Sequence, residues 1–401
     1  MKAPRLAWLI LIIAAGSIAV GSGVRSMVGV MIPLIEYDLG YGRADLSVVA
    51  SVAFFVYAFS QPLSGWAVGH FGPKRALLAG AVLLVLSGLG MIWASSLLAI
   101  HLFLGILPML GFSVGGLLPG TVLAVRWFSH RQGLTTGVVV GALPGGQAFF
   151  AALASVALLA FPWREAYVML TLIFAVVLLL LILFVVRDTP ERRAQDTTPN
   201  SSAPVSTIRH VTKTRNFWLL VIGYLACGIT DQIMLVHMVP FLADEGYSAA
   251  GGGGIFALLS IFGLAGSVIV GSMVDSIEAR YVIAGTYLIR ALSYFFLFAF
   301  TSSGSLWLLV AFAIVFGVTY MGNLPPTSVF VSSAYGSEVL GSTMGWLTLI
   351  HHLGGAGGVL FAGIIYERLG GYAASFVGSV IVLLLAVVAS VILPRTRAPR
   401  I

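Results

Sequence analysis

Twelve long apolar runs divide the chain and limit what it can fold into. Each is close to the length of about 20 residues that an α-helix needs to cross the hydrocarbon core of a bilayer. We place them at 7–35, 44–69, 75–96, 98–126, 133–160, 164–187, 216–243, 250–274, 281–301, 304–332, 339–366 and 371–394. Charged residues make up only 9% of the chain and the set AVILMFWYC 59%, which is too apolar for a water-exposed surface. The sequence therefore predicts an all-α membrane protein with twelve transmembrane helices.

One long polar segment separates the sixth run from the seventh. Residues 188–215 contain Thr-Pro and Ser-Ser pairs and charges of both signs, which is typical of a linker without a packed core. The predicted domains are an N-terminal six-helix bundle over 1–187, a cytoplasmic linker over 188–215 and a C-terminal six-helix bundle over 216–401.

Lysines and arginines gather on one side of the predicted spans, and only Arg43, Arg164 and Arg368 fall on the other. Cationic loops are retained in the cytoplasm, so both termini and the linker are expected there. The formal net charge of +7 resides in loops between spans, so no nucleic-acid partner is predicted. Arginine outnumbers lysine heavily, which favours a bacterial source and a multi-pass protein of the inner (plasma) membrane.

The two halves of the chain repeat each other at an offset of 206 residues. The loop after the second span contains Lys74, and the loop after the eighth contains Arg280 at the matching position. Repeats of this kind predict two homologous six-helix halves related by a pseudo-twofold axis along the membrane normal.

The twelve spans, the six-plus-six repeat and a loop of the form Gly-x-x-x-Asp-x-x-Gly-x-Lys/Arg after spans two and eight resemble the major facilitator superfamily. The first loop departs from the pattern with Gly69 in place of the aspartate, and the second has Glu278 in place of the glycine. In that family the loop helps to lock the cytoplasmic gate. The resemblance therefore implies gating roles for Gly65, Lys74, Arg75, Asp275 and Arg280.

Within the superfamily, the chain is similar to bacterial relatives of the monocarboxylate porters. The similarity rests on Arg25 in the first span, before an exit that contains Pro33, and on the Arg-Trp-Phe-Ser-His-Arg-Gln-Gly segment at 126–133. Those porters carry a substrate arginine in span eight, whereas residues 250–274 contain no arginine or lysine. The resemblance implies a small organic anion, a monocarboxylate, as the substrate.

Few ionisable residues lie inside the predicted spans. Arg25 and Asp231 occupy matching positions in the two halves, because 231 minus 206 is 25. An arginine at bilayer depth costs roughly 2.5 to 3.5 kcal/mol on insertion scales, so it is kept with a partner or for a task. Residues related by the pseudo-twofold can face each other across a central cavity, and we predict that Arg25 and Asp231 approach each other.

The charge balance of this pair leads to a transport hypothesis. Arg25 keeps its charge, whereas Asp231 can take up a proton. An anion that displaces Asp231 from Arg25 leaves a buried carboxylate, which is costly unless it is protonated. The hypothesis is a secondary active transporter in which Arg25 binds a monocarboxylate and Asp231 carries a proton. The alternatives are a proton-coupled exporter of lipophilic or cationic compounds, a static pair that fixes helix packing, and an Arg25 that snorkels.

Other polar residues in the spans have two interpretations each. His237 can relay the proton or bind carbonyls freed at Pro240. His351 and His352 point about 100° apart on a helix, so at most one faces the cavity; we select His352, with an interior hydrogen bond as its alternative. Arg290 is interpreted as structural and paired with a cytoplasmic gate acid or a backbone carbonyl.

The remaining candidates for the substrate site are polar groups of spans two, five and ten. They are Tyr57, Gln147, Tyr320 and Asn323. Hydrogen bonds between helices are the competing explanation for each.

No feature of the sequence indicates an enzyme. It has no phosphate-binding glycine-lysine loop, which excludes an ATP-driven pump by this chain alone. The single cysteine, Cys227, lies in an apolar run, which argues against zinc binding and thiol catalysis. No catalytic residue, metal or cofactor is predicted. The expected partners are the organic anion, the proton and the lipid bilayer, with the chain acting as a monomer.

Overall fold

The chain is helical and contains twelve membrane-length segments. The computed structural model describes residues 5–128, 132–187, 209–274, 276–336 and 339–395. The segments long and apolar enough to span a membrane are Arg5–Leu39, Arg43–Phe71, Pro73–Met91, Leu97–Ala124, Val138–Ala157, Trp163–Phe184, Arg215–Asp244, Ala249–Met273, Ala279–Ser303, Leu306–Tyr335, Leu340–Leu369 and Ala373–Ile392. The predicted all-α fold with twelve spans is confirmed.

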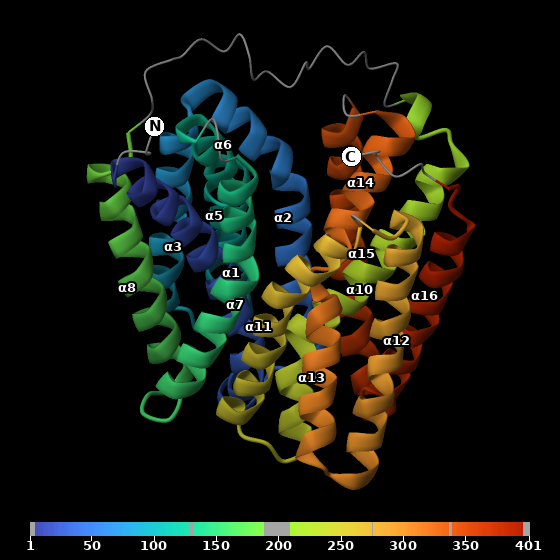
Figure 1. Ribbon diagram of the computed structural model, residues 1–401. Helices are drawn as coiled ribbons and strands as arrows, with labels where there is room; N and C mark the ends of the chain where they lie inside the picture. Colours follow the sequence, from blue (N-terminus) through green and yellow to red (C-terminus); the bar gives the residue numbers. More distant parts are fainter. Residues whose placement is uncertain (1–4, 129–131, 188–208, 275, 337–338, 396–401) are drawn as a thin grey trace. The chain divides into compact units, whose positions relative to one another are not determined.

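The described residues form two compact units, and Figure 1 labels all of their helices except α4 and η1. Unit 1 contains residues 5–187 together with 235–257, and unit 2 contains residues 209–234 together with 258–395. The helices before the linker are α1 (Arg5–Leu39), α2 (Arg43–Phe71), α3 (Pro73–Met91), α4 (Leu97–Ile100), the π-helix η1 (His101–Ile106), α5 (Leu107–Gly115), α6 (Leu117–Trp127), α7 (Gln132–Ala157) and α8 (Trp163–Phe184). The helices after it are α10 (Arg215–Asp244), α11 (Ala249–Met273), α12 (Ala279–Ser303), α13 (Leu306–Tyr320), α14 (Leu324–Tyr335), α15 (Leu340–Leu369) and α16 (Ala373–Ile392).

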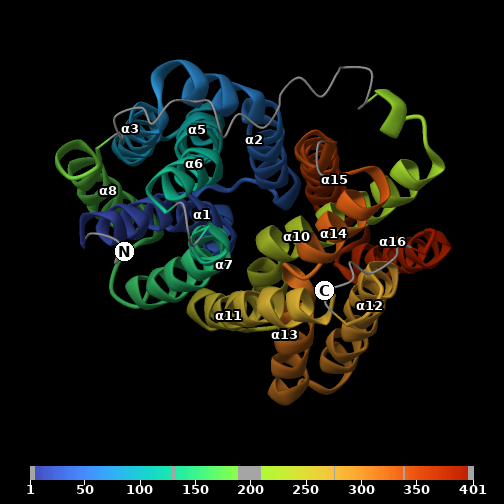
Figure 2. The same ribbon diagram turned by 45° about the horizontal axis from the view of Figure 1, so that its top comes forward.

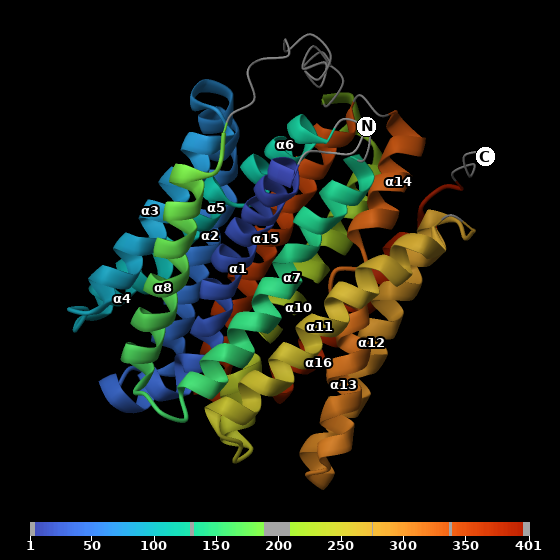
Figure 3. The ribbon, with the colours of Figure 1, turned by 60° about the vertical axis from the view of Figure 1, so that its left-hand side comes forward.

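Helices α1 and α7 pack closely side by side within unit 1 (Figure 3). A Cβ atom at Gly146 of α7 would collide with the backbone of Ala19 in α1, so this contact requires glycine. Serine hydroxyls donate across the same contact, from Ser22 to the carbonyl of Leu143 over 3.0 Å. Small residues and hydroxyl hydrogen bonds are the usual means of holding helices together in a bilayer. This packing fixes the position of the buried stretch of α1.

Within unit 2, α12 lies beside α13 and α16 (Figure 2). The ring of Tyr294 in α12 is fully buried, and its centroid lies 5.8 Å from that of Phe312 and 6.0 Å from that of Phe376. These aromatic contacts pack α12 into the interior of the unit. The same helix carries Arg290 one turn earlier.

The fourth and tenth spans are both broken, and the breaks match in the repeat. The fourth span is interrupted at Gly116, between α5 and α6, and the tenth at residues 321–323, between α13 and α14. Gly116 and Gly322 are 206 positions apart, as are Pro119 and Pro325, which follow the two breaks. Proline has no N–H to donate to the preceding turn, so each break leaves carbonyl groups that need other donors.

A π-helical turn, η1, lies in the fourth span before its break. The N–H group of Leu107 bonds the carbonyl of Leu102, five residues earlier. Pro108 follows directly and cannot donate to Leu104, which favours the wider turn. Isolated π turns are frequent at functional sites, so η1 is of interest where it meets α2.

The close approach of α3 to α5 yields a first prediction. A Cβ atom at Gly80 would lie 2.5 Å from the Cα atom of Gly115 and 2.6 Å from the carbonyl oxygen of Gly111. We expect Gly80→Val to destabilise the protein by about 1 to 3 kcal/mol through overpacking. Thermal unfolding of the purified protein in detergent measures the effect.

Gly285 in α12 provides the matched control, because a Cβ atom there meets no atom within 4 Å. Gly285→Val is expected to leave the unfolding temperature nearly unchanged. Equal unfolding temperatures for the two variants would show that the α3–α5 contact does not require glycine.

Candidate functional site

Arg25 is buried in α1 between two aromatic rings. It is 7% exposed, and its Cζ atom lies 5.6 Å from the ring centroid of Phe54 and 5.7 Å from that of Phe112. Gly21 lies one helical turn before Arg25, and a Cβ atom there would collide with Phe112, so glycine admits the ring. The electron-rich faces of the rings attract the guanidinium but do not cancel its charge.

Among the described residues of unit 1, no carboxylate oxygen lies within 4.0 Å of the Arg25 guanidinium. Its buried Nε atom also has no hydrogen-bond partner there. A buried cation without a counter-ion is costly, because little surrounding water or protein charge compensates it. The charge of Arg25 is therefore not compensated by any described carboxylate of unit 1.

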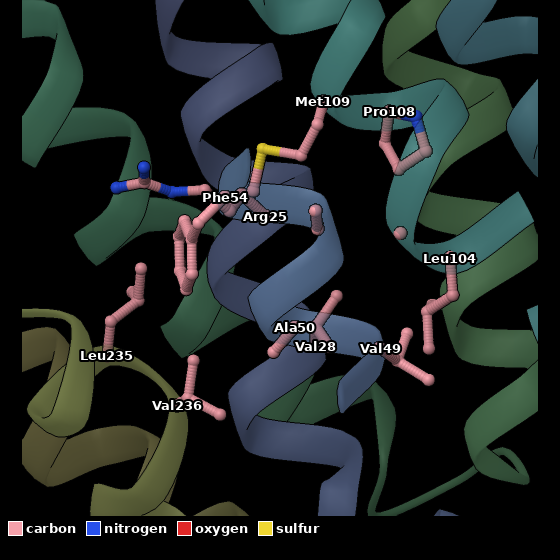
Figure 4. A pocket seen from close by; sticks show the side chains of 12 residues that line it. Arg25, Val28, Val49, Ala50, Phe54, Leu104, Pro108, Met109, Leu235 and Val236 are labelled. Carbon is pink, nitrogen blue, oxygen red and sulfur yellow. The ribbon is translucent and has the colours of Figure 1, made fainter. Parts of the chain in front are cut away.

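A pocket of unit 1 adjoins Arg25 (Figure 4). Among the twelve described residues that line it, Arg25 is the single charged one. The others are Val28, Val49, Ala50, Ala53, Phe54, Leu104, Gly105, Pro108, Met109, Leu235 and Val236. The pocket thus combines one cation with an apolar wall contributed by α1, α2, the π-helical fourth span and residues 235–236 of α10.

Two predicted substrate residues of unit 1 lie near Arg25. The ring of Tyr57 stacks on Phe112 at 5.0 Å, so both residues share that ring with Arg25. Gln147 of α7 accepts a bond from the hydroxyl of Ser26, the neighbour of Arg25, through its backbone carbonyl at 3.3 Å. The fully buried side-chain amide of Gln147 has no partner for its nitrogen or oxygen within the described residues. An unpaired buried amide is costly, so it is suited to a polar ligand.

Asp231 forms an ion pair with Arg290 in unit 2. Its Oδ1 atom lies 2.7 Å from Nη1 of Arg290, and both side chains are buried. Its Oδ2 atom accepts a bond from the thiol of Cys227 at 3.2 Å and lies 4.0 Å from Nε2 of His351. Arg290 thus supplies a counter-charge to Asp231 that the sequence analysis did not predict. The approach of Asp231 to Arg25 stays a prediction.

Arg290 also binds the end of a broken helix. Its Nη2 atom donates to the carbonyl of Thr319 and, at 3.1 Å, to the carbonyl of Tyr320. Its Nε atom donates to the hydroxyl of Thr319 at 3.2 Å. These carbonyls are the last of α13 and are exposed by the break in the tenth span, where a positive charge is also favoured by the helix dipole. The predicted contact with backbone carbonyls is confirmed, whereas the predicted gate acid is wrong because the acid is Asp231.

The remaining predicted residues of unit 2 lie around this pair. Tyr320 is buried and contributes its carbonyl to Arg290. Asn323 lies in the break, is 4% exposed, and its side-chain nitrogen and oxygen have no partner among the described residues. His352 is buried, with its ring centroid 5.0 Å from that of His351. The sequence selected His352, but the structure brings His351 to Asp231.

His237 is buried in the part of α10 that groups with unit 1. Its role as a proton relay stays a prediction.

Cys227, Asp231 and His351 offer three possible metal ligands within 4.8 Å of one another. However, the Nη1 atom of Arg290 lies 3.3 Å from the sulfur of Cys227 and 2.7 Å from the carboxylate of Asp231. A guanidinium at this distance repels a metal cation. We therefore interpret the group as an ion-pair network.

The predicted gating residues make contacts within their own units. The Nζ atom of Lys74 donates to the carbonyl of Leu183 at the end of α8, and Nη1 of Arg280 donates to that of Leu393 after α16, each over 3.1 Å. A cation thus binds the carboxyl end of the last helix in each half, which satisfies free carbonyls. A Cβ atom at Gly65 would lie 3.8 Å from Leu118, and Arg75 is exposed. Asp275 lies outside the described residues, and gating by all five stays a prediction.

One charged network of unit 1 was missed by the sequence analysis. Arg43 is 7% exposed and donates to both carboxylate oxygens of Glu36, with Nη2 at 2.8 Å from Oε2. It also donates to both oxygens of Asp244, each at 3.3 Å. The sequence contained one indication of these acidic residues, because Asp38 and Asp244 match at the 206-residue offset. In the structure, Asp38 accepts a hydrogen bond from the indole N–H of Trp163 at 3.0 Å.

Comparisons with known proteins agree with this architecture. The sequence profile described as Major Facilitator Superfamily matches residues 14–358 and 239–401. The MFS-type transporter YcxA of Bacillus subtilis is 24% identical over 92% of this chain and 90% of its own. Monocarboxylate transporter 13 of Bos taurus is 25% identical over 92% of this chain and 85% of its own.

Among solved structures, a bacterial homologue of the human lysosomal transporter Spinster superposes with a TM-score of 0.76. The match covers 97% of both chains at 17% identity. At that identity the similarity concerns the fold.

The ion pair of unit 2 yields a second prediction. Arg290→Ala is expected to destabilise the protein by about 3 to 5 kcal/mol, because it leaves the buried carboxylate of Asp231 without its counter-charge and removes the guanidinium donor of the α13 carbonyls. The double variant Arg290→Met with Asp231→Asn should recover part of the loss by removing the buried charge. Thermal unfolding in detergent checks both, with the exposed Arg75→Gln as the control. A single variant as stable as that control would contradict a structural role for the pair.

Proposed function

The chain belongs to the major facilitator superfamily, and we propose that it is a secondary active transporter that moves a monocarboxylate together with a proton by alternating access. The observation that carries the proposal is Arg25, a buried cation without a carboxylate within 4.0 Å among the described residues of unit 1. Similarity to a monocarboxylate transporter over most of the chain supports the substrate class.

Arg25 is suited to bind a carboxylate directly. A guanidinium presents two parallel N–H donors to a carboxylate, and such charge-assisted bonds are strongest where water is excluded. The apolar pocket wall supplies that exclusion. Gln147 and Tyr57 are the further ligands that we propose in unit 1, because Tyr57 shares Phe112 with Arg25 and the amide of Gln147 has no partner among the described residues. In unit 2, Tyr320, Asn323 and His352 are proposed as additional substrate contacts.

The ion pair between Asp231 and Arg290 changes how a proton would be coupled. An incoming anion need not displace Asp231, because that carboxylate already has a counter-charge. We propose instead that the proton is held between Asp231 and His351, whose facing atoms are 4.0 Å apart. Histidine changes charge near neutral pH and can take the proton while Asp231 stays bonded to Arg290. His237 is retained as a possible relay.

An exporter of cationic compounds is the rival function. The charge of Arg25 opposes a cation in the pocket, and Asp231 is already neutralised by Arg290. Both observations favour the anion. The distribution of lysine and arginine further supports a bacterial inner-membrane location with cytoplasmic termini. Gating by the loops after spans two and eight, and a monomeric state, belong to the same proposal.

The substrate role of Arg25 is tested by transport. Purified protein in proteoliposomes should take up labelled lactate or another monocarboxylate when an inward pH gradient is imposed. Arg25→Gln should lower uptake at least tenfold, because the carboxylate loses its counter-charge in an apolar site. Arg209→Gln, at an exposed arginine, is the control. Wild-type uptake of no carboxylate, or an Arg25→Gln protein that transports normally, would end the anion proposal.

Proton coupling is tested separately. His351→Gln leaves the pair of Asp231 with Arg290 intact but removes the group that we propose to accept the proton. It should permit exchange of labelled for unlabelled substrate and abolish accumulation driven by a pH gradient. Asp231→Asn is also expected to permit exchange and abolish accumulation, and to be less stable than the wild-type protein. Full accumulation of substrate by both variants would show that neither His351 nor Asp231 takes part in proton coupling.

A further inference from the structure

The guanidinium of Arg25 lies over the rings of Phe54 and Phe112. We propose that Phe112 is a positioning residue, which holds this guanidinium ready for the carboxylate of the substrate. The inference rests on the proposed function, because it concerns how Arg25 is prepared to bind the anion.

The ring of Phe112 is held firmly near the end of α5. It is buried and stacks on the ring of Tyr57, with centroids 5.0 Å apart and planes inclined by 14°. A Cβ atom at Gly21 of α1 would collide with Cδ2 of Phe112, and a Cβ atom at Gly116 would lie 3.1 Å from the same atom. Two glycines thus leave the space that the ring occupies. Phe112 is therefore a fixed platform between α1, α2 and the break in the fourth span.

The side chain of Arg25 needs such a platform, because a long side chain has many rotamers to choose from. Its buried Nε atom has no hydrogen-bond partner among the described residues. Figure 4 shows its guanidinium directed away from Leu104 and Pro108, so the far wall of the pocket does not hold it. The aromatic rings are the contacts left to orient the guanidinium.

An aromatic ring is suited to hold a cation that must also bind an anion. The face of the ring attracts the positive charge, and the attraction is stronger where water is excluded. A carboxylate of the protein in the same place would occupy the N–H donors of the guanidinium and neutralise its charge. Phe112 does neither, so the donors of Arg25 stay available for the substrate.

Loss of the contact with Phe112 should weaken binding in a recognisable way. Without the ring, the guanidinium distributes over other rotamers, and the fraction in the binding-competent orientation falls. The apparent affinity for the anion falls in proportion to that fraction. The maximal rate of transport depends on steps after binding, so it should change much less.

The inference is tested by replacing Phe112 with phenylalanines that carry one, two or three ring fluorines. Fluorine withdraws electrons from the ring face and changes the shape of the ring little. The half-saturating concentration of labelled lactate in proteoliposomes should rise with each fluorine, by roughly 3- to 30-fold in total. The maximal rate should stay within about twofold of the wild-type value, because the positioned guanidinium acts on binding.

Fluorinated phenylalanine at Phe150 of α7 is the matched control. Phe150 is also buried against α1, where a Cβ atom at Gly23 would collide with its ring. Among the described residues, the rings over which the Arg25 guanidinium lies are those of Phe54 and Phe112 and not that of Phe150. The fluorinated series at Phe150 should therefore leave the half-saturating concentration unchanged.

A structure of the Phe112→Leu protein provides a readout that does not depend on transport. Leucine keeps an apolar side chain on α5 but has no ring face, so the Arg25 guanidinium should leave its wild-type position or lose its ordered density. Phe150→Leu is the control, and it should leave the guanidinium in place.

The outcomes separate this inference from the proposed function. Half-saturation by lactate that does not depend on the number of fluorines at Phe112 would overturn the positioning role and leave the anion transporter intact. An unmoved guanidinium in the Phe112→Leu structure would do the same. Absence of carboxylate uptake by the wild-type protein would overturn both, because Arg25 would then have no anion to receive.

Discussion

Two buried arginines in the membrane-spanning helices have opposite electrostatic situations, and the account of function depends on that contrast. Arg290 has a carboxylate at 2.7 Å and carbonyls at the end of a broken helix, so its charge is fully used by the protein. Arg25 has two aromatic rings and an apolar pocket but no carboxylate within 4.0 Å among the described residues of unit 1. Because an uncompensated buried cation is costly, we propose that Arg290 stabilises the structure and that Arg25 binds the substrate anion.

The broken spans explain why a buried arginine is needed at position 290. A bilayer supplies no water to free backbone groups, so a helix can break only where other protein groups satisfy its carbonyls. Arg290 donates hydrogen bonds to the carbonyls freed by the break in the tenth span, and its buried charge then requires the carboxylate of Asp231 as a counter-ion. The matching break at Gly116 has no arginine at the corresponding position, since 290 minus 206 falls on Leu84. The two halves therefore share the broken helix, but only the second half has a buried arginine beside the break. The charged groups around the two breaks differ for that reason.

Sequence patterns predicted the fold well because long apolar runs and repeat offsets depend on local composition. All twelve spans were found, and the 206-residue offset extends to the broken helices. The pairing of Asp231 with Arg290 did not follow from that offset, because the repeat does not relate positions 231 and 290. The partner, Arg290, is 59 residues away, and only packing of α12 against α10 and α13 brings it there. The π turn at η1 and the network of Arg43 likewise depend on tertiary contacts that no local pattern records.

The central claim is that Arg25 receives the carboxylate of the substrate, and a structure with a bound brominated aliphatic acid tests it most directly. We predict that the anomalous scattering of bromine places the acid beside Arg25, with its carboxylate within hydrogen-bond distance of the guanidinium. A carboxylate of the protein bonded to Arg25 in that structure, or the acid bound at Arg290 with Arg25 left bare, would contradict it.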